Sequence, residues 1–199
     1  MENFNKISKI VQNSKYYEIS HDIAKAITRE SSPEGIIFEI DIPKQTPAPI
    51  SLNDRVLLLY KISDPGNLGT LIRSARALDW NHVVLIDDCV DPFNPETIRS
   101  SMGTSLKSNL HFLKSEQLKE FILRNHINLF IADMKADEPV NNDTDRRPLG
   151  LLLGSEANGF KGFPKDIYDS FKKICVKISI DTESLNVAVC GGILMNKLR

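Results

Sequence analysis

The sequence predicts an α/β fold in which helices cover both faces of a mostly parallel sheet. From residue 55 onward, short segments that are apolar throughout alternate with segments whose apolar residues recur at helical spacing. Strands without polar alternation are typical of parallel sheets that are buried beneath helices on each side. The chain has 199 residues, of which 41% are hydrophobic, so it is long enough to bury one substantial core.

The first part of the chain has a different pattern. Apolar residues at helical spacing predict helix over residues 4–30, with Ser20 as a cap for its second stretch. A turn and a short strand at 36–40 follow. Residues 43–51 contain three prolines, which remove backbone donors and fix φ, so this segment is predicted to be an extended linker. We therefore divide the chain into residues 1–50 and 51–199.

After the linker, strands and helices alternate. An apolar helical face supports the helix that starts at Asn67, and Asn94 with Pro95 forms a typical start for the next one. The predicted strands are 55–62, 82–87, 109–113, 127–134, 149–153 and 175–180, and the predicted helices are 67–80, 94–102, 115–125, 164–171 and one from Ser184 onward.

Composition narrows the possible functions. The 25 basic and 26 acidic side chains give a net charge of −1, so any nucleic-acid surface has to be a local patch. The three cysteines form no CxxC pair and the four histidines no HxxxH spacing, which argues against a structural metal site and favours a reducing compartment. With no apolar run near 20 residues and no signal-peptide pattern, we expect a cytoplasmic protein that does not span a membrane.

Three loops are predicted to follow strands and to lead toward helices, which is where parallel α/β sheets bind ligands. They are "SDPGNLGTLIRSA" (63–75), "LLLGSEANGF" (151–160) and "ESLNVAVCGG" (183–192). Glycines in these loops permit a close approach of the backbone to a ligand, and helix starts expose N–H groups. Together the loops carry an amide, a guanidinium, a carboxylate and a hydroxyl.

Each of these residues also has a purely structural interpretation. Asn67 or Ser184 could be a helix cap, and Glu156 could be an acid in the first turn of a helix. Gly191 and Gly192 could serve close helix packing. These interpretations do not explain why all three loops share the same position in the predicted fold. A Rossmann GxGxxG, a P-loop and a Ser-His-Asp arrangement are all missing from the sequence.

The three loops resemble, in order, the signature motifs of the SpoU family of RNA ribose 2′-O-methyltransferases, which belongs to the SPOUT superfamily. "NLGTLIRSA" is similar to the first motif, "LLLGSEANGF" to the second and "SLNVAVCGGI" to the third; "DPFNPETIRSSMG" (91–103) is similar to the stretch between the first two. The resemblance covers about residues 52–199. Residues 1–42 resemble only the later half of the L30e-like substrate-binding domain that often precedes the catalytic domain.

The resemblance implies several properties. The fold would contain a deep C-terminal trefoil knot, and the cofactor would be S-adenosylmethionine, with no metal. The substrate would be RNA, with rRNA favoured over tRNA, and the protein would act as a homodimer. The residues implied for the cofactor pocket are Leu153, Gly154, Ser155, Ile178 and Leu185. The loop before the third motif is shorter than is usual in the family, so Ile180 competes with Ile178 for this role.

The resemblance also assigns the reacting site to Asn67, Arg73, Glu156, Ser184 and Asn186. A guanidinium keeps its proton, so we expect Arg73 to bind a phosphate beside the target ribose in bidentate fashion rather than to act as a base. Asn67, Ser184 and Asn186 would hold the ribose and the loops, and Glu156 would organise this network. A catalytically silent protein of the same fold, which binds RNA or forms dimers, is the alternative.

Overall fold

The computed structural model describes residues 15–28, 31–33, 35–136 and 148–199, and the chain divides into two compact units, residues 1–41 and 42–199. In the first unit, helix α2 (His21–Thr28) begins after Ser20, whose Oγ accepts a hydrogen bond from the Ile23 N–H at 3.4 Å, as predicted. The helix predicted for residues 4–14 lies outside the described residues. Among the described helices, none is both long enough and apolar enough to span a membrane.

The strand predicted at 36–40 is wrong. This segment has no regular structure, and Ile36, Phe38 and Ile40 are 40%, 57% and 56% exposed. An alternating apolar pattern favours a strand only where a neighbouring strand accepts and donates the backbone hydrogen bonds. No described strand pairs with this segment.

The second unit contains a six-stranded sheet in which every neighbouring pair is parallel. In spatial order the strands are β3 (Asn109–Leu113), β2 (His82–Ile86), β1 (Arg55–Tyr60), β5 (Leu149–Leu153), β4 (Asn128–Ala132) and β6 (Lys172–Ile174). The predicted α/β class is therefore confirmed.

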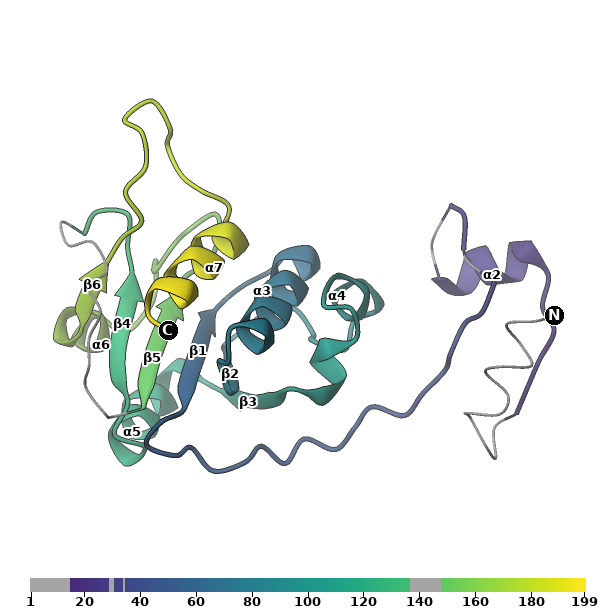
Figure 1. Cartoon of the computed structure of the whole chain (residues 1–199), viewed down its shortest axis with the longest axis horizontal. Coiled ribbons are helices and arrows are strands. Elements are labelled where there is room, and N and C mark those ends of the chain that lie inside the picture. The colour runs from purple at the N-terminus through teal and green to yellow at the C-terminus, as the bar shows by residue number, and fades with distance from the viewer. Residues whose placement is uncertain (1–14, 29–30, 34, 137–147) are drawn as a thin grey trace. The chain divides into compact units, whose positions relative to one another are not determined.

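Helices cover both faces of this sheet (Figure 1). Helices α3 (Pro65–Ala77) and α7 (Val187–Lys197) share one core with Leu57 and Leu59 of β1. Helices α5 (Ser115–Arg124) and α6 (Lys165–Ser170) share the other core with Val56 and Leu58. Alternate residues of a strand point to opposite faces, so the same apolar strand supplies both cores. Helix α4 (Pro95–Ser100) packs against α3, with Asn94 as its cap as predicted.

The last strand lies earlier in the chain than predicted. Strand β6 is Lys172–Ile174, and residues 176–186 have no regular structure and project as a long loop before α7 (Figure 1). Ile174 pairs with Ala132, the last residue of β4, and Cys175 adds a single bridge beyond it. The apolar residues of 176–180 join no ladder of the described sheet.

The strand order places a ligand site between β1 and β5. The chain builds β1, β2 and β3 toward one edge, then crosses to β4, and β5 inserts between β4 and β1. Leu59 near the end of β1 lies opposite Leu153, the last residue of β5. In open parallel sheets, ligands bind beyond the carboxyl ends of strands at such a switch point.

At the opposite end of β1, three titratable side chains form a hydrogen-bonded row. His82 Nε2 lies 3.2 Å from Asp54 Oδ2, and His82 Nδ1 lies 3.1 Å from His111 Nε2. His82 is 2% exposed. Burial, with a smaller contribution from His82, lowers the pKa of His111 to about 4.

This row makes folding sensitive to acid. The pKa of His111 in the folded chain lies below its ordinary value of 6.5, so the neutral form is favoured on folding and stability is lost as pH falls from 6.5 toward 4. We expect a loss of about 1 kcal/mol, because water at this half-buried site screens the shift. Urea unfolding at several pH values measures how the free energy of unfolding of the wild type and of His111→Gln changes with pH, which gives a slope for each protein. The His21→Gln control in α2 should keep the wild-type slope, and an unchanged slope in His111→Gln would contradict the assignment.

Candidate active site

The first loop starts helix α3 with an acidic cap. Asp64 is the N-cap, and its Oδ1 accepts a hydrogen bond from the backbone N–H of Asn67 at 2.6 Å, while Pro65 occupies the first turn. Asn67 is therefore not the cap, and its side chain is free to act elsewhere. Sequence reasoning missed the capping role of Asp64, although an acid directly before a proline is a typical helix start.

The three loops meet in a row of side-chain hydrogen bonds. Asn67 Nδ2 donates to Glu156 Oε1 at 3.1 Å, and Asn186 Nδ2 donates to Asn67 Oδ1 at 2.8 Å. The amide of Asn67 thus uses its donor toward one loop and its acceptor toward the other. Three positions that are far apart in the sequence are brought together at the carboxyl edge of β1 and β5. The arrangement orients one carboxylate and two amides relative to one another.

Asn186 also begins helix α7. Its Oδ1 accepts hydrogen bonds from the N–H groups of Ala188 at 2.9 Å and Val189 at 3.3 Å. The predicted start at Ser184 is therefore wrong, because Asn186 satisfies the free N–H groups of the first turn. Ser184 is exposed and lies two residues before the cap, and it makes no hydrogen bond to the network among the described residues.

Glu156 lies in a tight turn rather than in the first turn of a helix. Ser155 and Gly159 exchange backbone hydrogen bonds at 3.1 and 2.9 Å, which close the turn after β5. A Cβ on Gly154 would lie 2.8 Å from the carbonyl carbon and oxygen of Gly159, so only glycine fits there. Leu153 is buried in the core that α3 and α7 share. The strand end is thus fixed, and the turn carries Glu156 outward.

Arg73 follows Asn67 along α3 by less than two turns. It is exposed, and it makes no hydrogen bond or ion pair with another described residue. Its guanidinium is consequently available to an external anion. The structure does not bring Arg73 into the row formed by Asn67, Glu156 and Asn186.

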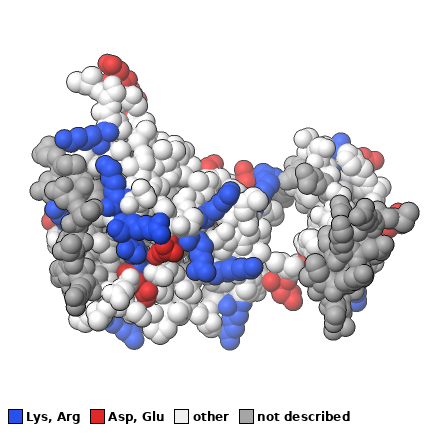
Figure 2. Space-filling model, in the orientation of Figure 1, with Lys and Arg blue, Asp and Glu red and all other residues white. Residues whose placement is uncertain are grey.

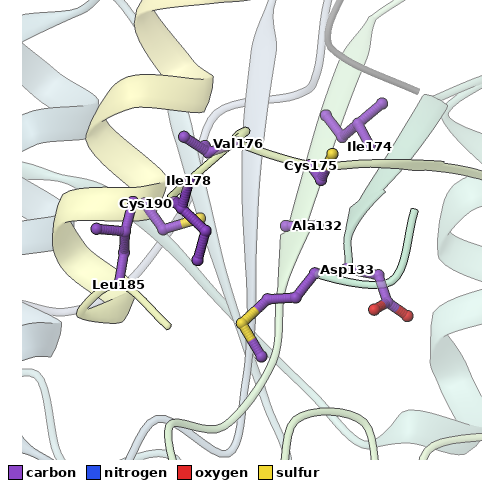
Figure 3. Close-up of a pocket in the computed structure, with 9 residues that line it drawn as sticks. Ala132, Asp133, Ile174, Cys175, Val176, Ile178, Leu185 and Cys190 are labelled. Carbon is purple, nitrogen blue, oxygen red and sulfur yellow. The ribbon is translucent and has the colours of Figure 1, made fainter. Parts of the chain in front are cut away.

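A small cavity of about 60 Å³ lies at the carboxyl ends of β4 and β6 (Figure 3). Ile178 and Leu185, from the projecting loop, form its wall together with Cys190 of α7. Ile180 is 98% exposed and does not line it. The close-up shows Leu185, Ile178 and Cys190 on one side, with Ile174 and Cys175 on the other.

The wall of this cavity is predominantly apolar. Burial raises the pKa of the Cys190 thiol above its ordinary value, so this side chain remains a neutral thiol. Asp133 lies at the cavity floor, and its carboxylate accepts a hydrogen bond from the Tyr168 hydroxyl. That bond raises the pKa of Tyr168 to about 12, which keeps the phenol protonated as a donor. Sequence reasoning missed both residues, because nothing local connects them.

The sheet, the switch-point network and the adjoining cavity define a class: α/β proteins that bind a ligand at the carboxyl edge of a parallel sheet. Residues 54–196 match the SpoU rRNA Methylase family. The chain belongs to this family.

Two relatives align with nearly the whole chain. It is 30% identical over 192 residues to the 23S rRNA (guanosine(2553)-2′-O)-methyltransferase RlmP of Bacillus subtilis, covering 92% of this chain and 72% of that protein. It is 27% identical over 191 residues to an uncharacterized tRNA/rRNA methyltransferase of Synechocystis, and the alignment covers 96% of this chain and 69% of that protein.

A solved structure shares the fold. The AdoMet-bound rRNA methyltransferase from Sinorhizobium meliloti superposes with a TM-score of 0.81 at 22% identity, covering 98% of this chain and 76% of that one.

Proposed function

We propose that this protein transfers a methyl group from S-adenosylmethionine to a ribose 2′-hydroxyl of RNA. The observation that carries the proposal is the Asn186–Asn67–Glu156 row, which joins all three family motifs at the switch point of the sheet. The Bacillus subtilis relative is named for this reaction on 23S rRNA, which makes rRNA our first choice of substrate and tRNA the second.

The residues around the cavity fit this cofactor. Ile178 and Leu185 offer an apolar wall, and Gly154 lets the Gly159 backbone pack closely against the end of β5, which fixes the turn beside it. We assign cofactor contacts to these three residues and to the backbone at Leu153 and Ser155. When bound, S-adenosylmethionine supplies a methyl group that is already activated by the sulfonium, so the proposed transfer needs no metal ion.

The protein's own residues then have to align the ribose and accept a proton. Arg73 would bind a phosphate next to the target ribose with two parallel N–H bonds, which would orient the 2′-hydroxyl. As the O–C bond forms, the hydroxyl proton leaves through a phosphate oxygen or a water molecule. Asn67, Asn186 and Ser184 hold the ribose, while Glu156 keeps the Asn67 amide oriented.

A basic surface supports RNA as the substrate. Figure 2 shows Lys and Arg side chains gathered on the face that α3 and α7 form. The exposed basic residues of these helices and the residues just after them are Arg73, Arg76, Lys197 and Arg199. Asp79, just after α3, pairs with Arg199 at 2.8 Å, and Figure 2 shows further acidic side chains among the basic ones. Arg73 thus lies within a surface that is suited to the phosphate backbone.

Further parts of the proposal rest on the family resemblance. We propose that the chain forms a trefoil knot and a homodimer, and that residues 1–50 are part of an L30e-like substrate-binding segment. Val189, which is 52% exposed on α7, offers an apolar contact for a second copy. We also propose a cytoplasmic location, in which the thiols of Cys89, Cys175 and Cys190 stay reduced. The catalytically silent alternative is disfavoured, since the residues of the network are present and bonded.

Titration with S-adenosylhomocysteine tests the cofactor assignment. We expect one-site binding that Leu185→Arg weakens at least about tenfold, because a buried charge would replace the apolar wall. Ile180→Arg is the matched control, since Ile180 is exposed, and it should bind as the wild type does. Methyl transfer to in-vitro transcribed rRNA and tRNA fragments then identifies the substrate. A folded protein that binds no S-adenosylhomocysteine would support the silent alternative.

A further inference from the structure

A second and larger cavity lies away from the proposed active site. It measures about 510 Å³ and opens between α5, the edge strand β3 and residues 47–50 of the proline-rich segment. Ligand pockets commonly have this size. Its apolar walls come from Pro47, Pro49 and Ile50 on one side and from Leu113 and Phe121 on the other. Such a lining suits a partly apolar ligand.

His111 lines this cavity, and its Nε2 lies 3.1 Å from His82 Nδ1. The Asp54 carboxylate, 3.2 Å from His82 Nε2, favours a proton on that nitrogen, and in this tautomer His82 Nδ1 accepts from His111 Nε2–H. The remaining nitrogen of His111, Nδ1, then carries the lone pair. The low pKa of His111, caused mainly by burial, keeps this ring neutral above about pH 5. The T-shaped contact with Phe121, at 5.6 Å between ring centres, holds the ring in place.

Helix α5 adds two charged groups that are not used elsewhere. Gln117 Oε1 already accepts from the Lys114 N–H, and Asn125 Nδ2 donates to the Phe121 carbonyl. Glu120 and Arg124 line the cavity, are exposed and form no ion pair or hydrogen bond with another described residue. The cavity therefore combines two acceptors, at His111 and Glu120, with one cation that suits a phosphate.

We propose that this cavity binds one unpaired nucleotide of the RNA substrate, with an amino-bearing base between the apolar walls and its phosphate on Arg124. Guanine matches best, because its N1–H and amino group give adjacent donors to a carboxylate such as Glu120. This inference rests on the proposed function for the identity of the RNA. The cavity and the proposed cofactor site are separate, since they share no lining residue.

Titration of the whole chain with GMP and UMP tests the proposal. We expect GMP to bind with a dissociation constant of about 1 to 10 mM, several-fold tighter than UMP. Arg124→Gln should weaken GMP at least about fivefold and remove its advantage over guanosine, and Glu120→Gln should remove its advantage over UMP. Glu116→Gln on the same helix is the matched control and should leave binding unchanged.

The outcomes separate this site from the proposed function. Binding of GMP that persists in Leu185→Arg and at saturating S-adenosylhomocysteine places the nucleotide outside the cofactor site, as expected. GMP binding that is lost with Arg124→Gln in a protein that binds no S-adenosylhomocysteine would refute the methyltransferase assignment and retain a nucleotide site. Absence of GMP binding, or binding that neither α5 variant alters, would overturn the inference.

Discussion

Replacing Arg73 by lysine is expected to slow methyl transfer about 100-fold while leaving the free energy of unfolding within about 0.5 kcal/mol of the wild type. Lysine keeps the charge but cannot make two parallel N–H bonds to one phosphate, so the ribose hydroxyl loses its alignment. Arg73 is exposed and has no partner among the described residues, so the fold has no contact to lose. Single-turnover methylation of the identified RNA, with urea unfolding alongside, measures both quantities.

Arg76 provides the matched control for this experiment. It lies one turn further along α3 and is equally part of the exposed basic surface. Arg76→Lys should therefore change the turnover less than about threefold. Near-normal turnover in Arg73→Lys would show that charge alone suffices, and the bidentate phosphate contact would have to be abandoned.

Replacing Gly69 by alanine should destabilise the second unit by about 3 kcal/mol. A Cβ at this position would lie 1.9 Å from Ser100 Oγ, 2.6 Å from the Thr97 carbonyl and 2.7 Å from the Ser101 nitrogen. Two of these atoms belong to the backbone of α4 and its cap, so helix α4 would have to move away from α3. Ser100 Oγ also donates to the Pro65 carbonyl at the start of α3, which couples this packing to the loop that carries Asn67.

Gly192 in α7 is the control, because a Cβ there would meet nothing within 4 Å. Gly192→Ala should raise the free energy of unfolding by roughly 0.5 to 1 kcal/mol through better helix propensity. Urea denaturation of both variants and of the wild type measures these changes in the free energy of unfolding. A Gly69→Ala protein as stable as the wild type would mean that α3 and α4 can separate at little cost.

The central sheet was predictable because β1, β2 and β5 are apolar on both faces. This pattern is typical of strands that are buried between two layers of helices. Strand β6 was not, because two of its three residues are lysines. An edge strand meets solvent and needs no apolar pattern, and charged edges also discourage unwanted pairing. Conversely, residues 36–40 and 176–180 have the composition of strands but belong to no strand of the described sheet. Local pattern thus indicates the ability to pair, while the position of other strands decides whether pairing happens.

The loops and residue types of the candidate site follow from the sequence, but the connections between them do not. That Asn67 donates to Glu156 and accepts from Asn186 depends on how β1 and β5 end side by side, which only the strand order determines. The choice between Ile178 and Ile180 likewise depends on the course of an irregular loop. Periodicity carries no information there, whereas the folded chain places Ile178 in the cavity wall.

Asn186 performs two tasks with one amide, since its oxygen caps α7 and its nitrogen donates to Asn67. We therefore expect helix α7 to start and the Asn186–Asn67–Glu156 row to form in the same step of folding. A refolding molecule gains its cofactor site only when α7 has docked on α3 and β5, however early the rest of the sheet has formed. After dilution from urea, S-adenosylhomocysteine binding should then return at the rate of the slowest refolding step. The rate at which binding returns would therefore measure how fast the fold is completed.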